Sequence, residues 1–146
     1  MSASNAFETL LLQLIFENAN AANVGDATGL RGSTTAGVFY VGLHTADPGE
    51  AGAQNTTEAN YTGYARVSVA RSTAGWTVTG NTVVNDAAVT FGACTAGSST
   101  CTHFSLGTDV SGAGNLLMSG ALTGSLAVTA GVTPSFAAGA LTATFD

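Results

Sequence analysis

The chain has 146 residues, enough for one ordinary domain, but only 8% of them are charged, with three arginines, no lysine and a net charge of -6. Duplex DNA and anionic membrane surfaces attract cationic proteins, so this composition excludes nucleic acid and membrane as expected partners. Ordinary soluble domains contain about 25% charged residues. A neutral surface of small residues therefore predicts that other subunits cover much of it, with a bacterial surface protein or fibre as the alternative.

Residues 5–18 predict the only good helix. Five apolar residues share one stripe at i, i+3, i+4, i+7 and i+8 spacing, namely Phe7, Leu10, Leu11, Leu14 and Ile15. Asn5 is placed to cap this helix, and Glu8 stands where a capping box has its acid. Leu12 and Phe16 fall outside the stripe, so either the helix lies deep in the core or its second flank meets another chain. The apolar run is too short to cross a bilayer and lacks the basic start of a signal peptide, which predicts folding in the cytoplasm.

Residues 18–36 are rich in Asn, Gly and Thr without periodicity, which predicts a long loop or extended arm. We therefore divide the single domain into an N-terminal helix and arm, residues 1–36, and a β-body, residues 37–146. An arm of this kind can reach a neighbouring subunit. The expected subunit contacts are Phe7, Leu11, Leu12, Leu14, Phe16, Leu30 and Arg31.

The β-body shows short strands separated by turn residues. Strands are expected at residues 37–45, 64–71, 76–79, 87–93, 102–106, 115–122, 125–130 and 140–145. This spacing predicts a mainly β fold, a single β-sandwich or jelly-roll-like domain with one N-terminal helix. The expected core residues are Phe39, Val41, Leu43, Val67, Val69, Val89, Phe91, Phe104, Leu106, Leu117, Phe136 and Leu141.

Cys94 and Cys101 bracket a six-residue loop. If they lie opposite each other on a hairpin, Phe91 pairs with Phe104 on the other face, and a cross-strand disulfide becomes geometrically plausible. Because cytoplasmic assembly delays oxidation, two free thiols are the alternative. Together with His103 the cysteines resemble a zinc triad, but the close Cys spacing and the fourth ligand of structural zinc sites are missing, so no metal or other cofactor is expected.

No motif for catalysis stands out. His44 and Asp47 close one strand end, but no nucleophile elbow, metalloprotease motif or phosphate loop accompanies them, so a solvated or capping histidine is the expected role. Three acids, Asp47, Glu50 and Glu58, lack the calcium-loop spacing and are expected to form a solvated edge. Tyr61, Tyr64 and Trp76 would suit an aromatic sugar-binding platform, with packing as the simpler role.

Several motifs in a fixed order resemble a family of small tailed-phage virion proteins along nearly the whole chain. They are the run from Phe39 to Pro48, Gly63-Tyr64-Ala65-Arg66, Val89-Thr90-Phe91, Thr102-His103-Phe104, Gly114-Asn115-Leu116-Leu117, Gly120-Ala121-Leu122-Thr123 and the run from Pro134 to Leu141. Members of that family begin with a short helix that ends in an Asn-rich turn. Some carry the label phage tail fibre protein, and others act as capsid cement or decoration proteins. The family has no catalytic residues to carry over, and the two cysteines are not part of its pattern.

We therefore expect a non-enzymatic capsid cement or decoration protein. It would bind the major capsid protein on the outer surface of the virion as a symmetric dimer or trimer, after synthesis in the host cytoplasm. The alternative is a tail fibre or tail-tip module that binds host glycans. A metal-dependent hydrolase built on Cys94, Cys101 and His103 is a third, weaker hypothesis.

Overall fold

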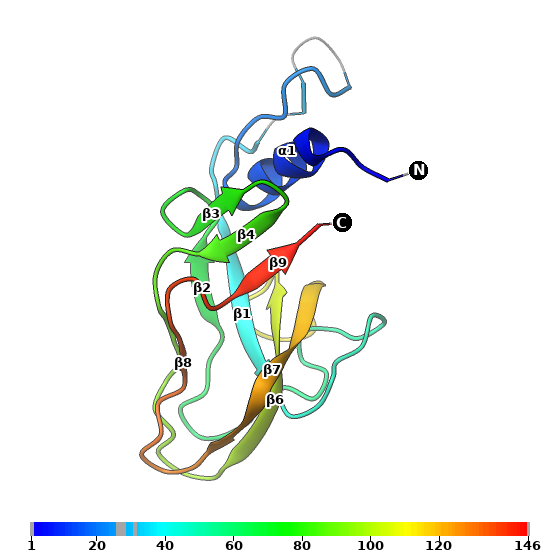
Figure 1. The fold of residues 1–146 in the computed structure, drawn as a ribbon. Coiled ribbons are helices and arrows are strands. Elements are labelled where there is room, and N and C mark those ends of the chain that lie inside the picture. Colours follow the sequence, from blue (N-terminus) through cyan, green and yellow to red (C-terminus); the bar gives the residue numbers. More distant parts are fainter. Residues whose placement is uncertain (1, 26–28, 31, 146) are drawn as a thin grey trace. The chain divides into compact units, whose positions relative to one another are not determined.

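The computed structural model describes residues 2–25, 29–30 and 32–145, and this part of the chain is mainly β, with a single N-terminal helix, α1 (Asn5–Phe16) (Figure 1). The strands are β1 (Val38–His44), β2 (Val67–Ala70), β3 (Trp76–Thr79), β4 (Thr82–Asn85), β5 (Val89–Thr90), β6 (Ser99–Gly107), β7 (Leu116–Val128), β8 (Ser135–Phe136) and β9 (Thr142–Thr144). The expected class, a β-sandwich-type fold with one N-terminal helix, is confirmed.

The strands form three sheets, with the orders β2-β1-β6-β7, β3-β4-β9 and β5-β8. In the largest sheet β1 pairs with β6 and β6 with β7, both antiparallel. Two strands that we expected separately, at 115–122 and 125–130, are one strand, β7, and β4 and β8 were not foreseen. β6 does not pair with β5, so the hairpin register proposed for the two cysteines is wrong.

The chain divides into two compact units. Unit 1 contains residues 1–38, 70–88 and 136–146, and unit 2 contains residues 39–69 and 89–135. Each unit is described by itself below. The division that the sequence suggested, between residues 36 and 37, stays a prediction.

Unit 1 is built on a short hairpin. Residues 80 and 81, Gly-Asn, form its two-residue turn, and Gly80 takes the positive φ that such turns require. β9 pairs with the other side of β4. The buried Asn85 side chain donates to the carbonyls of Ala87 and Ala137 and accepts from the Leu141 amide, so it holds the C-terminal segment against the hairpin.

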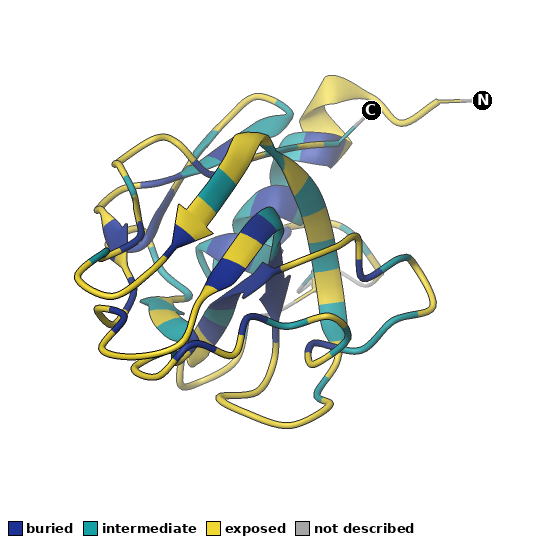
Figure 2. Cartoon of the chain, turned by 90° about the horizontal axis from the view of Figure 1, so that it is seen from below, coloured by how far each residue is buried: buried dark blue, intermediate teal, exposed yellow. Residues whose placement is uncertain are grey.

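The expected core is largely confirmed. Buried members are Phe39, Val41, Leu43, Val89, Phe91, Leu106 and Leu141, and half-buried ones are Val67, Val69, Phe104 and Phe136. Leu117 is instead 43% exposed. It lies on β7, an outer strand of its sheet, where side chains alternate between half-buried and exposed; Figure 2 shows this alternation as bands along the strand.

Candidate assembly surface

Helix α1 begins at Asn5, as the sequence predicted, but it ends at Phe16, two residues before the predicted end at residue 18. Ser4, not Asn5, is the N-cap, and its Oγ accepts from the amide of Phe7 at 3.4 Å while its carbonyl accepts from the amides of Phe7 and Glu8. Glu8 therefore lies beyond the capping-box position. The side-chain oxygen of Ser4 thus meets the Phe7 amide, one of the donors that lack an i−4 partner at the start of a helix.

Helix α1 packs within unit 1 through a narrow face, which is not the five-residue stripe that the sequence suggested. Glu8, Leu12 and Phe16, spaced four residues apart, are buried, and the Phe16 ring meets the Trp76 ring edge-on at 5.0 Å between centroids. The five-residue stripe that we expected to pack is only partly covered. The packing face is decided by Trp76 and the hairpin beneath it, which the helical periodicity of α1 alone does not reveal.

The C-terminal end of α1 is fixed by hydrogen bonds to distant residues. Arg71 donates from Nε to the Ile15 carbonyl at 2.6 Å and from Nη2 to the Leu14 carbonyl at 2.7 Å. These are carbonyls at the negative end of the helix dipole, where a guanidinium is favoured. Glu17 Oε1 accepts from the amide of Val78 at 2.9 Å. The helix is therefore held as a rigid part of unit 1.

The segment after the helix folds back on itself in the described residues. Asn18 donates from Nδ2 to the Ser33 carbonyl and accepts at Oδ1 from the Ser33 amide, and Ala21 and Leu30 form a backbone bridge. Gly29 has a φ of +74°, and a Cβ there would lie 2.3 Å from the Ala21 carbonyl oxygen, so no larger residue fits. Asparagine side chains thus hold the described residues of this segment as a folded loop, one of the two forms that the sequence predicted.

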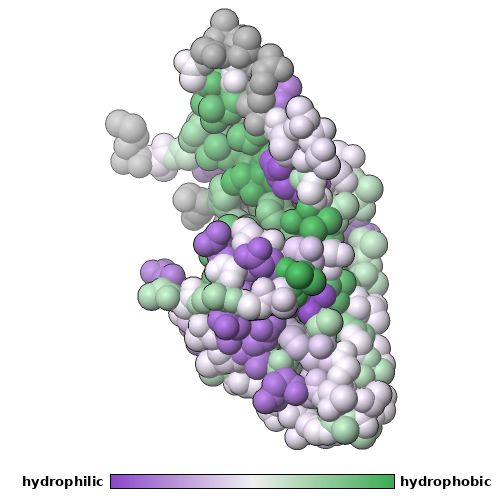
Figure 3. Space-filling view, turned by 180° about the vertical axis from the view of Figure 1, so that it is seen from behind, coloured by the Kyte–Doolittle hydropathy of each residue, from purple (hydrophilic) through white to green (hydrophobic). Residues whose placement is uncertain are grey.

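The partly exposed face of α1 is an apolar surface without charge. We call it the helix stripe and define it as Phe7, Leu10, Leu11, Leu14 and Ile15. Phe7 is 40% exposed, and the others are half-buried. Figure 3 shows hydrophobic side chains gathered over this helix. Such a surface is suited to burial against apolar side chains of another protein.

The expected contact residues therefore divide into three groups. Phe7, Leu11 and Leu14 lie on the helix stripe, and Leu30 is 41% exposed. Leu12 and Phe16 are buried within unit 1 and so do not present their side chains to a partner. Arg31 lies outside the described residues.

His44 is neither solvated nor a cap, as the sequence suggested, but fully buried at 0% exposure in unit 2. Its Nδ1 lies 2.8 Å from the Thr56 carbonyl oxygen and its Nε2 lies 2.7 Å from Ser105 Oγ. Because a carbonyl only accepts, Nδ1 carries the proton and the Ser105 hydroxyl donates to Nε2. Burial lowers the pKa of His44. Asp47 does not join this pair; its Oδ1 accepts from the Gly49 amide.

A second buried polar group in unit 2 fixes the loops beside His44. Arg66 donates from Nε and Nη2 to the two carboxylate oxygens of Glu58, at 2.6 and 2.8 Å, and also to the carbonyls of Asp109 and Gly112. The Tyr64 hydroxyl donates to Glu58 Oε1 and accepts from the Leu43 amide. Burial raises the pKa of this hydroxyl, which keeps it protonated. Glu58, expected on a solvated edge, is instead mostly covered, with a side chain that is 17% exposed, and it anchors Arg66 and Tyr64.

This network was not foreseen as a set of contacts. The Gly63-Tyr64-Ala65-Arg66 motif was noticed only as part of a family pattern. The sequence did hold one signal for it. Arg66 is one of only three arginines in the chain, and it stands within an expected strand of alternating residues, where a charged side chain indicates a buried, paired role.

The aromatic platform proposed for sugar binding is not formed. Tyr61 and Trp76 are buried, and Tyr61 donates its hydroxyl to the Gly92 carbonyl. Tyr61 and Tyr64 meet edge-on at 5.5 Å in unit 2, whereas Trp76 packs on Phe16 in unit 1. These rings contribute to packing in their own units.

Both cysteines are buried with free thiols. Cys94 Sγ donates to the Ala96 carbonyl at 3.4 Å, and burial raises the pKa of the Cys101 thiol. His103 Nδ1 lies 2.9 Å from the hydroxyl oxygen of Thr102. Within the described ranges, no three His, Cys, Asp or Glu side chains gather closely enough to hold a metal ion.

Comparison with known proteins gives one family. A family model described as Podophage GP4 fiber I protein gp80 matches residues 2–144. No curated protein matches the chain. Across the described residues, no helix has the length and apolar character needed to cross a membrane.

Proposed function

We propose that this chain, which belongs to the family described as Podophage GP4 fiber I protein gp80, is a capsid cement or decoration protein that binds the outside of the major capsid shell. The family is one of phage structural proteins, so the chain is a phage structural protein. The helix stripe carries the finer assignment. It offers a capsid subunit an apolar, uncharged surface on a helix that its own unit holds fixed.

The physical basis of the proposal is apolar burial on a rigid element. Complete burial of a Leu or Phe side chain contributes about 1.5–3 kcal/mol, and the partly exposed Phe7 and Leu11 retain a fraction of that gain. Because Arg71 and Glu17 already fix the helix, docking orders few further groups and loses little conformational entropy. A shell that expands under internal DNA pressure would have to break such contacts. No cofactor and no catalytic step is part of this role.

A symmetric arrangement completes the proposal. We expect the protein to bind as a dimer or trimer around a local symmetry axis of the shell, so that each copy places the same helix stripe on a capsid subunit. Contacts repeated over many copies add up even when each one is weak.

The test is binding of a helix-stripe variant to empty shells made of the major capsid protein. The double variant Phe7→Ser and Leu11→Gln removes two apolar side chains, and we expect binding to weaken about tenfold or more, equivalent to about 1.4 kcal/mol. Co-sedimentation with shells measures the occupancy. The matched control is Val110→Thr, an exposed apolar residue of unit 2 with 62% exposure, which should bind as the unchanged protein does.

Two outcomes count against the proposal. Wild-type occupancy of the double variant, with its circular dichroism and melting temperature unchanged, would remove the helix stripe from the interface. Failure of the unchanged protein to bind shells at any concentration would remove the capsid itself as the partner.

A second candidate rests on the word fiber in the family description. A tail fibre or tail-tip module would be present in a few copies at the tail, whereas a cement protein would be present in many copies over the head. Quantitative mass spectrometry of purified virions gives the copy number, and immunogold labelling gives the position. A few copies confined to the tail would replace the cement assignment with the fibre assignment.

A further inference from the structure

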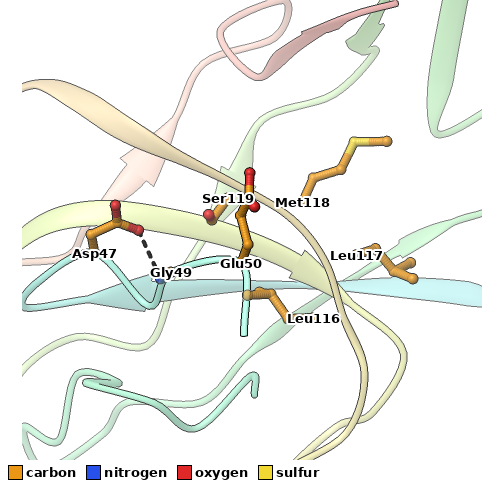
Figure 4. A pocket seen from close by; sticks show the side chains of 7 residues that line it. All are labelled: Asp47, Gly49, Glu50, Leu116, Leu117, Met118 and Ser119. Atoms are coloured by element: carbon orange, nitrogen blue, oxygen red, sulfur yellow. Dashed lines mark hydrogen bonds between the residues drawn. The ribbon is translucent and has the colours of Figure 1, made fainter. Parts of the chain in front are cut away.

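A surface groove of about 500 Å³ lies in unit 2, between a loop after β1 and the first part of β7 (Figure 4). Two acids of the loop, Asp47 and Glu50, line it on one side. Four consecutive residues of β7, Leu116 to Ser119, line it on the other. No basic residue lines this groove.

The groove runs along the free edge of β7. Consecutive side chains of a strand point to opposite faces, so a groove that meets four in a row lies against the edge of the strand. β7 is the last strand in the order β2-β1-β6-β7, and no residue of β6 lines the groove. The groove is therefore on the side away from β6, where the backbone N–H and C=O groups of β7 face outward.

β7 lacks the side chains that usually protect an open edge. Its 13 residues include no Lys, Arg, Asp, Glu or Pro. The protection that it has lies in two irregularities of its pairing with β6. Between the pairs Cys101–Leu126 and His103–Ala121 the register shifts, so residues 122–125 are opposite Thr102 alone, and between Leu106–Met118 and Gly107–Leu116 a second shift leaves Leu117 as an extra residue. The regular edge open to another strand is therefore short, from Met118 to Ala121.

The charge of the groove indicates what would enter it. Asp47 and Glu50 are both acidic, and the chain has a net charge of -6. The chain has no lysine, and Arg66 and Arg71 are bonded to Glu58 and to the end of α1 within their own units. Arg31 lies outside the described residues. A cation for this groove is therefore best supplied by a different protein.

We propose that the groove receives an extended, lysine- or arginine-bearing segment of another protein, which adds to the edge of β7 as a strand. Backbone hydrogen bonds to residues 118–121 give the pairing, and the cation lies between Asp47 and Glu50. Apolar side chains of the segment pack on Leu117 and Met118. The helix stripe belongs to unit 1, so this inference does not depend on the proposed function.

The experiment uses the full chain and a panel of fluorescein-labelled six-residue peptides with alternating Val and Thr and one Lys at each position in turn. The double variant Asp47→Asn and Glu50→Gln removes both charges but retains an acceptor for the Gly49 amide. We expect it to bind the best peptide about threefold to tenfold more weakly, because exposed ion pairs contribute modestly to affinity. The control Asp86→Asn removes one acid of unit 1 and should bind as the unchanged chain does.

Backbone pairing is tested separately by hydrogen exchange. On peptide binding, alternate amides within residues 118–121 should gain protection, since the intervening ones already face β6. The same peptide with alternate amides methylated should not bind. Equal affinity of the charge-neutralised variant, protection away from β7, or no binding by any peptide of the panel would each overturn the proposal. So would protection of this edge in the free chain through self-association, which would assign the edge to a second copy.

Discussion

In unit 1 the helix stripe leaves apolar side chains partly exposed, whereas in unit 2 a buried arginine is paired with a mostly covered glutamate. This is the reverse of the usual arrangement, in which charges cover the surface and apolar groups fill the core. The difference shows how a chain with few charges uses them. Glu58 and Arg66 fix loops inside unit 2, and Arg71 and Glu17 fix the helix inside unit 1.

The consequence is a division of tasks between the two regions. The network of unit 2 stabilises the fold and presents little for recognition, because its hydrogen bonds are made internally. The helix stripe adds less to the fold, because its side chains are only partly covered, and it offers a surface for assembly. Substitutions in the two regions should therefore differ in how much they lower the free energy of unfolding.

The largest effect is expected from breaking the ion pair of unit 2. Arg66→Met removes the partner of Glu58 and the donors to the carbonyls of Asp109 and Gly112, leaving a mostly buried carboxylate without its cation. We expect the free energy of unfolding to fall by about 3–5 kcal/mol. Urea denaturation measures it. The double variant Glu58→Gln and Arg66→Met should recover part of the loss, and a double variant no more stable than the single one would show that the charge is not the cause.

Next in size is the loss of packing under α1. Leu12→Ala empties a fully buried site and should lower the free energy of unfolding by about 2–5 kcal/mol. Leu11→Ala, the matched change on the helix stripe, should cost clearly less, because Leu11 is only half-buried. Thermal or urea unfolding of the two variants gives the comparison directly. Equal losses would mean that the two faces of the helix are equally covered, contrary to the structure.

A smaller effect is expected at the end of the helix. Arg71→Met removes the donors to the Leu14 and Ile15 carbonyls and should cost about 1–3 kcal/mol. Hydrogen exchange should rise in the last turn of α1 more than in β3 and β4. Arg71→Lys, which keeps the charge but not the planar group, should recover only part of the protection. If exchange in α1 stayed unchanged, the helix would be held by packing alone.

The sequence predicted the helix, most strands and most of the core, because periodicity reports which side chains share a face. It did not predict which face of α1 is buried, since that depends on Trp76, which is 60 residues away from Phe16 along the chain. It also missed β4, although a Gly-Asn turn stands before it, and β8, which is only two residues long.

The candidate sites divide in the same way. Phe7, Leu11, Leu14 and Leu30 were predicted as contacts with other subunits; they are at least partly accessible, and the contacts themselves stay a prediction. The partners of His44, Glu58 and Arg66 lie 8 to 61 residues away along the chain, so no local pattern reveals them. The groove beside β7 likewise depends on sheet order, which sequence spacing does not fix.

The smallest effect expected is the pH dependence that His44 gives to stability. In the unfolded chain this histidine has a pKa near 6.5, and in the folded chain burial lowers its pKa, with Arg66 and His103 acting in the same direction and the Thr56 carbonyl and Glu58 opposing. Below pH 6.5 the unfolded chain therefore binds more protons than the folded chain, so the free energy of unfolding decreases as the pH falls from about 6.5 towards the folded pKa. Above pH 6.5 the contribution of the neutral imidazole is fully present.

Urea denaturation at pH 7.5 and 5.5 measures this dependence of the free energy of unfolding on pH. The variant His44→Asn keeps a donor for the Thr56 carbonyl; it should be less stable at pH 7.5 but should lose less stability on acidification. An identical slope in the two proteins would mean that His44 does not titrate in this range, and that the buried pair with Ser105 is insensitive to acid.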